Sequence, residues 1–392
     1  MIPDTIAANH VGDALQTRAI STLTRIEWSA LMTMHNLADG HARQGDLNQA
    51  VLDRLPEIFR KAEASLQLEV QQDFERVFFK AAGQPSVLER AQKPLYHYSS
   101  SLSIEVVANH FRLEGITVGL LHPTFDNIPD ILKRHGVPLI PVSEDVFTDP
   151  GSLDCWDEID ALFLVVPNNP TGLDPRVEDV ERIALECRDR GKVLVVDFSF
   201  RLFSDHLATR DLYAFFEDNG VDHIGIEDVG KVWPTLDLKL GSLIAGPRRW
   251  DALEAITDDL LLNVSAFIFA LIAESGKSGI VERARSTSAT NRAILAEALA
   301  DGPVSPVEGG ATMSVAWLHL PEGWDCLELC VWLQTRGIAV LPGAPFFWAE
   351  PERGSRFIRI ALMRPLGEFE AAAKELASAL TDYQPHSGLE DD

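Results

Sequence analysis

The segment IEDVGKVWPTLDLKLG, residues 226–241, follows an apolar run that begins at Val221, and it places Lys231 directly after Gly230. A second lysine, Lys239, lies eight residues further along the chain. Lysine is rarely buried without a partner, and a lysine amine between apolar segments can be activated to form a Schiff base with a carbonyl compound. On this segment alone, the simpler interpretation of Lys231 is an exposed lysine where a strand meets a turn.

Three further segments carry polar side chains beside or inside apolar runs. They are VVPNNPTG (165–172), VLVVD (193–197) and FIRIAL (357–362), which contain Asn169, Asp197 and Arg359. In order and spacing, these residues and Lys231 resemble the aspartate-aminotransferase-like, fold type I enzymes that use pyridoxal phosphate. The resemblance implies that Asn169 bonds the phenolate oxygen of the cofactor and that Asp197 pairs with its ring nitrogen. It also implies that Lys231 forms the Schiff base and that Arg359 binds the α-carboxylate of the substrate.

The composition is that of a globular protein, with 392 residues, 46% hydrophobic and 24% charged. The net charge of −25 argues against a nucleic-acid or anionic-membrane surface, because both need basic patches. The four cysteines form no CxxC pair, and Cys326 and Cys330, four apart on an expected helix, suit core packing better than zinc. With no signal peptide or membrane-length apolar run, we expect a cytoplasmic protein without a metal site.

From residue 118 onward, apolar runs alternate with segments of helical periodicity. Strands are expected at 118–121, 137–141, 161–166, 193–196, 223–227 and 243–245, and helices at about 127–135, 176–190, 209–219 and 247–257. This alternation predicts an α/β fold with a mostly parallel central sheet flanked by helices. Ligands of such sheets bind at the carboxyl ends of the strands, where Asn169, Asp197 and Lys231 are expected.

Three units are expected along the chain. Residues 1–45 form an N-terminal segment that covers the active site, residues 46–300 a large cofactor-binding domain, and residues 301–392 a small α+β domain. Helical periodicity at 48–80 and 258–300 belongs to the large domain. The small domain is expected to hold strands at 314–317, 338–341 and 357–362 and helices at about 324–335 and 366–382. Residues 1–20 and 387–392 are expected to be loose.

A run of serines at residues 99–101 opens a helix, and free N–H groups at a helix start bind anions. By the resemblance, Ser100 and Ser101 lie at the cofactor phosphate, where a Gly-Ser/Thr pair is usual. Lys239 stands where the family usually has an arginine and supplies a point charge to the phosphate. Phe125 stacks on the cofactor ring, with a core phenylalanine as the alternative, and Ser199 joins the cofactor-binding set.

Two positions depart from the aminotransferase pattern. Asp228 stands three residues before Lys231, where a phosphate-binding serine is usual, and Phe200 stands where a tyrosine usually bonds the phenolate oxygen. Because a phosphate would repel a carboxylate, we expect Asp228 to point away from the phosphate site. Ordinary aminotransferases keep the serine and the tyrosine at these two positions, so the departures argue against simple transamination.

A more specific resemblance covers nearly the whole chain from about Thr24. The segments that carry it are NLADGHARQ (36–44), HPTFDN (122–127), SFR (199–201), residues 226–239 and WAEP (348–351). Together they are similar to the L-arginine oxidases and hydroxylases of streptomycete natural-product pathways, which use pyridoxal phosphate and O2 without metal or flavin. One difference is Val229, where threonine or serine is expected. The resemblance implies oxidation of L-arginine to 4-hydroxy-2-oxo-arginine, 2-oxo-arginine or dehydroarginine, with release of hydrogen peroxide and ammonia.

The resemblance also assigns the substrate side of the site. Glu27 and Asp228 bind the guanidinium group, since two carboxylates suit it best. Thr24 and Asp39 support or extend that site, and His41 lies near the step that adds water, where a histidine suits proton transfer near neutral pH. Simpler alternatives are a helix-capping box for Thr24 and Glu27, a bond from Asp228 to a neighbouring loop amide, and a loop histidine that bonds the backbone.

Other functions stay open. A conventional aminotransferase would need a keto-acid acceptor and no O2, and a pyridoxal phosphate cyclase or lyase could act on a hydroxyarginine. A non-catalytic regulator on the same fold usually carries a DNA-binding domain, and the sequence shows neither a spare domain nor a basic patch. The family pattern further implies a homodimer with its active sites at the interface.

Overall fold

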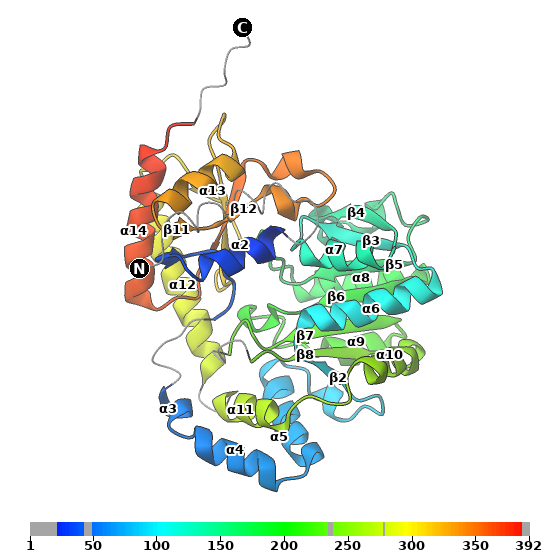
Figure 1. The fold of residues 1–392 in the computed structure, drawn as a ribbon. Helices are drawn as coiled ribbons and strands as arrows, with labels where there is room; N and C mark the ends of the chain where they lie inside the picture. The colour runs from blue at the N-terminus through cyan, green and yellow to red at the C-terminus, as the bar shows by residue number, and fades with distance from the viewer. Residues whose placement is uncertain (1–21, 43–48, 234–237, 277–278, 386–392) are drawn as a thin grey trace.

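The computed structural model describes residues 22–42, 49–233, 238–276 and 279–385, so the expectations for residues 1–20 and 387–392 lie outside the described residues (Figure 1). A seven-stranded sheet of order β2-β8-β7-β6-β5-β3-β4 forms the centre. Its strands are β2 (Leu95–His97), β3 (Val118–His122), β4 (Leu139–Ser143), β5 (Ala161–Val165), β6 (Val193–Asp197), β7 (His223–Asp228) and β8 (Gly241–Ala245). Strands β3 to β7 pair in parallel, and β8 and β2 are antiparallel. The predicted α/β class and mostly parallel sheet are confirmed.

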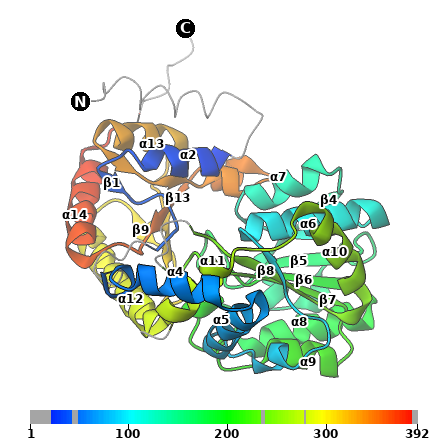
Figure 2. The ribbon, with the colours of Figure 1, turned by 60° about the horizontal axis from the view of Figure 1, so that its bottom comes forward.

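Helices cover both faces of this sheet, as Figure 2 shows, with α6, α7 and α10 on one side and α8 and α9 on the other. Their bounds are α6 (Ser100–Glu114), α7 (Asn127–Arg134), α8 (Val177–Asp189), α9 (Leu212–Asp218) and α10 (Pro247–Leu260). Because both faces are covered, every residue of β3, β5, β6, β7 and β8 is buried. This burial explains why these strands are nearly continuous apolar runs in the sequence.

The expected helical regions are interrupted. Residues 48–80 hold α3 (Gln49–Leu52), α4 (Leu55–Ala64) and α5 (Gln67–Ala81), and residues 258–300 hold the end of α10, α11 (Ala266–Gly276) and α12 (Ile280–Leu299). Pro56 sits in the first turn of α4, and Ser65 is extended at its end, which explains the breaks around that helix. Short 3₁₀ turns lie at Pro85–Leu88, Glu144–Phe147, Pro150–Ser152, Arg201–Phe203, Ala344–Phe346 and Pro351–Gly354.

A second unit follows α12 and is built on an antiparallel sheet of order β12-β13-β10-β9. Its elements are β9 (Ser305–Pro306), β10 (Val315–His319), β12 (Leu341–Pro342), β13 (Phe357–Ala361), α13 (Cys326–Thr335) and α14 (Leu366–Asp382). The strand expected at 338–341 is split, because β11 (Ile338–Ala339) pairs instead with β1 (His35–Asn36). Cys326 and Cys330 are buried in the core of this unit, as predicted. The two apolar cores meet inside α12, between Ala284 and Leu295, and the expected domain boundaries stay predictions.

Helix α2 (Thr22–Ala30) lies between the two units, beside α13 on one side and α7 on the other (Figures 1 and 2). Its buried face, formed by Leu23, Ile26 and Ala30, packs against Trp317 and Leu341 of the second unit. The other face of α2 is polar, and its residues Thr24 and Glu27 lie toward the carboxyl ends of the central strands. Within the described part of the chain, no helix is long and apolar enough to cross a membrane.

Candidate active site

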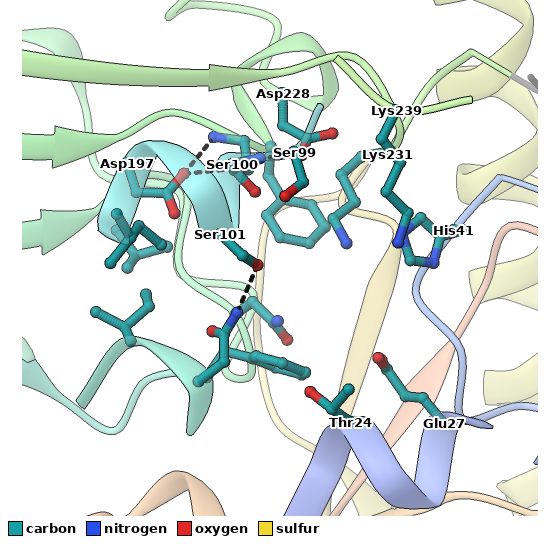
Figure 3. A pocket seen from close by; sticks show the side chains of 18 of the residues that line it. Thr24, Glu27, His41, Ser99, Ser100, Ser101, Asp197, Asp228, Lys231 and Lys239 are labelled. Atoms are coloured by element: carbon teal, nitrogen blue, oxygen red, sulfur yellow. Dashed lines mark hydrogen bonds between the residues drawn. The ribbon is translucent and has the colours of Figure 1, made fainter. Parts of the chain in front are cut away.

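A pocket at the carboxyl ends of β5, β6 and β7 brings together every predicted site residue except Asp39. About 770 Å³ of space lies between the lining atoms, part of it open to solvent. The predicted residues that line it are Thr24, Glu27, His41, Ser100, Ser101, Phe125, Asn169, Asp197, Ser199, Asp228, Lys231, Lys239 and Arg359. Figure 3 shows Thr24 and Glu27 projecting from α2 toward the space between Asp197 and the two lysines.

Asp197 is the last residue of β6, and its side chain is buried. Its Oδ1 accepts hydrogen bonds from the Ser199 N–H at 2.8 Å and the Ser199 hydroxyl at 2.5 Å. Burial raises the pKa of Asp197 to about 6, although the bonds from Ser199 act in the opposite direction. A nearby cation would favour the charged form, so this carboxylate suits pairing with a protonated ring nitrogen.

Lys231 lies in the turn that follows β7, and its amine is 5.6 Å from the centre of the Phe200 ring. Its charge acts on Asp197 and lowers the pKa of that carboxyl against the larger effect of burial. The turn is closed by Gly230, whose N–H donates to the Asp228 carboxylate at 2.5 Å. The sequence around Lys231 therefore folds so that the amine enters the pocket beside an aromatic face rather than standing at the surface.

The start of α6 forms a polar corner of the pocket. Ser99 caps this helix by accepting the Leu102 N–H at 3.2 Å, and the Ser101 hydroxyl accepts from Asn127 Nδ2 at 3.0 Å. Gly241 of β8 packs against this corner, since a Cβ there would lie 2.5 Å from the Ser99 carbonyl carbon. The free N–H groups of a helix start make such a corner an anion site.

The sequence analysis predicted that Asp228 would point away from that corner, but in the structure it points toward it. Its Oδ2 accepts from the Ser100 N–H at 3.4 Å, and its Oδ1 bonds Gly230, which is the loop-amide alternative. The positive end of the α6 dipole and the N–H groups of Ser100 and Gly230 attract the carboxylate. A phosphate at this corner would share the helix end with Asp228 and would need the positive charge of Lys239.

The substrate side of the pocket is built around Arg359, which is buried in β13. Its guanidinium donates to Asn169 Oδ1 and Glu27 Oε1, each at 3.3 Å, and to the Ala38 carbonyl. Glu27 also accepts the Gly40 N–H at 3.4 Å. Helix α2 has already begun at Thr22, so Thr24 and Glu27 do not form the alternative capping box.

Asp39 is close to the pocket but does not line it. Its Oδ1 accepts from the His41 N–H at 3.0 Å and contacts His41 Nδ1 at 2.6 Å. Although burial would raise it, the bonds and charge of His41 hold the pKa of Asp39 well below its usual range. The tight turn at Gly40 causes this pairing, because an aspartate side chain readily bonds a backbone N–H two residues on. Asp39 therefore contacts the pocket through His41.

Several lining residues were not predicted. They are Ser99, Ile104, Asn127, Ile128 and Val165, whereas Phe200, which also lines the pocket, had been singled out as a departure from the aminotransferase pattern. Ser99 and Asn127 stand inside segments that the sequence had singled out, and the preference of serine for a helix start was the available signal for Ser99. The apolar members carry no signal of their own, because an isoleucine on a buried helix face looks the same whether it faces a core or a ligand.

The residues of this pocket fit pyridoxal phosphate. Asp197 can pair with the ring nitrogen, Lys231 can attach covalently, and the start of α6 with Lys239 can bind the phosphate. Phe125 lines the same space, where its ring can cover the cofactor. Asp228 is the one residue that the phosphate would not favour. No group of three or more His, Cys, Asp or Glu side chains able to hold a metal occurs among the described residues.

Comparisons with known proteins agree with this geometry. The sequence matches the family Aminotransferase class I and II over residues 34–376. The solved structure of MppP soaked with the product 2-ketoarginine is 34% identical, covers 88% of this chain and 99% of its own, and superposes with a TM-score of 0.81. The α-aminoadipate aminotransferase LysN of Thermus thermophilus is 19% identical, with a TM-score of 0.75 and coverage of 94% and 96%, and shows the fold alone.

A curated relative, the aromatic aminotransferase ISS1 of Arabidopsis thaliana, is 28% identical over 248 residues. That alignment covers 58% of this chain and 57% of the relative, so the chain spans little more than half of that protein. The MppP match confirms the resemblance drawn from the motifs, because 2-ketoarginine is the 2-oxo-arginine expected there. The length of the family match and the strand-end positions of Asn169, Asp197 and Lys231 lead to one conclusion: the chain belongs to the aminotransferase class I and II family, whose members use pyridoxal phosphate and have fold type I.

Proposed function

We propose that this protein oxidises L-arginine with O2 and pyridoxal phosphate, giving 4-hydroxy-2-oxo-arginine, 2-oxo-arginine or dehydroarginine. The observation that carries the proposal is the set of charged side chains that line the pocket, a buried guanidinium, Arg359, and the carboxylates of Asp228 and of Glu27, which now bonds Arg359. L-arginine has the matching pattern, an α-carboxylate at one end and a guanidinium at the other. The 34% identity to MppP supports the same substrate class.

Bound pyridoxal phosphate would supply an electron sink for the substrate Cα, and the chain decides what happens around it. Asp197 holds a proton on the ring nitrogen, which strengthens that sink. The Lys231 amine takes the proton from Cα. Arg359 binds the α-carboxylate with two parallel hydrogen bonds, which frees Glu27 from its present bond to the same guanidinium. Glu27 then becomes available to the substrate side chain.

The Asp39–His41 pair supplies a second proton-transfer group. Asp39 is bonded to Nδ1, so it fixes the ring orientation of His41, which lines the pocket. A carboxylate that orients a histidine in this way is a common device of acid–base catalysis. In the proposed reaction, His41 delivers a water molecule to the substrate side chain.

The proposed chemistry balances without a metal or a flavin. One O2 accepts two electrons and two protons to give H2O2, and hydrolysis releases ammonia and 2-oxo-arginine. A second two-electron oxidation uses a second O2, and water then supplies the hydroxyl oxygen of 4-hydroxy-2-oxo-arginine. The hydrophobic face of Phe200 beside Lys231 suits O2 chemistry better than the tyrosine hydroxyl that is usual there.

The test is O2 uptake by the protein reconstituted with pyridoxal phosphate and given L-arginine without a keto acid. We expect O2 consumption, H2O2 and ammonia, and a product identified by mass spectrometry. Under ¹⁸O2 the added hydroxyl oxygen should stay unlabelled, because it comes from water. A product mass without added oxygen would identify a 2-oxo-arginine or dehydroarginine oxidase.

A conventional aminotransferase is the second candidate, since the names of the relatives LysN and ISS1 are those of aminotransferases. That activity would require a keto acid and would consume no O2. A cyclase or lyase would act on hydroxyarginine without O2.

Size-exclusion chromatography tests the expected homodimer, which would bury part of the surface around the pocket.

A further inference from the structure

The start of helix α2 is tied to the central sheet by one side chain. Asp126 Oδ2 accepts the Leu23 N–H at 2.8 Å, and the Thr22 N–H also bonds this carboxylate. Asp126 follows β3 and stands 103 residues away from Leu23 in the sequence. This bond therefore joins two parts of the chain that no shared element connects.

Asp126 makes this bond in place of an ordinary local one. Asp126 is the residue immediately before α7, yet its side chain does not cap that helix. It is 5% exposed, and no hydrogen-bond partner of its Oδ1 is found among the described residues. Burying a carboxylate in this state is costly, so the contact with α2 is a specific feature rather than a default of the loop.

The polar contacts of Glu27 tie α2 to Arg359 of the second unit and to the Gly40 loop, and neither of these lies in the central sheet. Leu23, Ile26 and Ala30 pack on the second unit through apolar contacts, which are not directional. The carboxylate at the helix start adds direction, because it must align with the free N–H groups of the first turn. Thr24 and Glu27, which face the pocket, lie within one and a half turns of that bond.

We propose that Asp126 is a positioning residue for the substrate. It fixes the start of α2 against the sheet, and this sets where Thr24 and Glu27 stand in the pocket. Asp126 itself does not line the pocket, so it acts through α2 and not by contact with substrate or cofactor. The inference rests on the proposed function only for the identity of the substrate.

The state of the carboxylate suggests a conservative variant. Burial raises the pKa of Asp126 to about 7, with further effects from the bond to Leu23 and the charges of Asp130 and Glu27. A neutral side chain that keeps the acceptor oxygen is therefore a fair replacement. Asp126→Asn should preserve the contact, whereas Asp126→Ala removes it and leaves two N–H groups without their acceptor.

The experiment compares the wild-type holoenzyme with Asp126→Ala, Asp126→Asn and the matched control Asp130→Ala, one turn further along α7. L-arginine is titrated under anaerobic conditions while the visible absorbance of the cofactor is recorded. We expect about 10-fold weaker arginine binding in Asp126→Ala, the loss expected for a missing helix cap. Asp126→Asn and Asp130→Ala should stay within about threefold of wild type, and cofactor affinity should change less than twofold in all variants.

Hydrogen exchange of the peptide that covers residues 22–30 separates this inference from the proposed function. Asp126→Ala should exchange at least about 5-fold faster there than wild type, and Asp126→Asn should restore slow exchange. If the wild type does not respond to L-arginine, the proposed function fails, and the exchange result decides the role of Asp126 alone. Unchanged exchange in Asp126→Ala, or unchanged arginine affinity in a responsive enzyme, would overturn the positioning role.

Discussion

The two walls of the pocket are built in different ways. On one wall, Asn169, Asp197 and Lys231 stand at or just after the ends of three neighbouring parallel strands. On the other, Glu27 and His41 come from α2 and the segment that follows it. The first wall, which we call the sheet wall, is positioned by the backbone hydrogen bonds of strands that are buried on both faces. The second, which we call the helix wall, is positioned by side chains that bond the backbone of a segment with little regular structure.

The bonds that hold the second wall come from two buried arginines. Arg359 donates to the Ala38 carbonyl, and Arg364 donates to the carbonyls of Asn36 at 2.7 Å and Asp39 at 2.6 Å. Hydrogen bonds to charged donors are stronger than neutral ones, so a few of them can fix a loop. Under the proposed function, the chemistry shared by the family belongs to the sheet wall, and substrate choice belongs to the helix wall.

The largest effect should come from the lysine of the sheet wall. Lys231→Ala should lower the rate of L-arginine-dependent O2 uptake by more than about 1,000-fold, because both the covalent attachment and the proton acceptor are lost. Lys239→Ala is the matched control, with the same substitution in the same pocket. It should weaken cofactor affinity about 10- to 100-fold and leave turnover at saturating cofactor within about threefold. Equal losses in both variants at saturating cofactor would contradict the distinct roles.

The helix wall should respond in substrate affinity rather than in turnover. Glu27→Gln should raise the KM for L-arginine about 10-fold, since one charged partner of the guanidinium is lost, and leave kcat within about threefold. The exposed Glu63→Gln on α4 controls for the loss of a charge. L-citrulline, a neutral analogue, should bind wild type and Glu27→Gln alike. An equal loss for both ligands would show that Glu27 acts through Arg359 instead.

The same contrast explains what the sequence could predict. The strands of the sheet wall are continuous apolar runs, so their ends, and the polar residues there, are visible in the sequence. In the central sheet, the three-residue strand β2 was missed, because it is too short to show a period. On the helix wall, the residues were predicted from the family resemblance, but their partners were not. The bond from Leu23 to Asp126 joins residues 103 apart, so no local pattern encodes it, whereas the contact between Asp39 and His41 is local to the turn at Gly40.

Asp228 shows the limit of an electrostatic argument made from sequence. The sequence argument considered only repulsion by a phosphate, and it left out the N–H groups of Ser100 and Gly230, which the carboxylate contacts in the structure. A helix start attracts any anion, whether it is a side chain or a phosphate. The sequence showed both the helix start and the acid, and their contact became visible only once β7 and α6 were placed together.

The smallest expected effect is a pH dependence that separates one acid of each wall. The pKa of Asp197 is raised to about 6, so the folded chain binds its proton more tightly than the unfolded chain does. The tighter proton binding favours the folded state fully below the pKa of Asp197 in the unfolded chain, and the benefit is lost as pH rises through about 6.

Between pH 5.5 and 7.5 the wild-type apoprotein should therefore lose about 1 kcal/mol of unfolding free energy relative to Asp197→Asn. Asp39 has a lowered pKa and is ionised in both states over this range, so its own proton should add no pH dependence to the difference between wild type and Asp39→Asn. Urea unfolding of the three apoproteins at both pH values measures this, and a pH-independent difference for Asp197→Asn would show that bonds from Ser199 outweigh burial at the sheet wall.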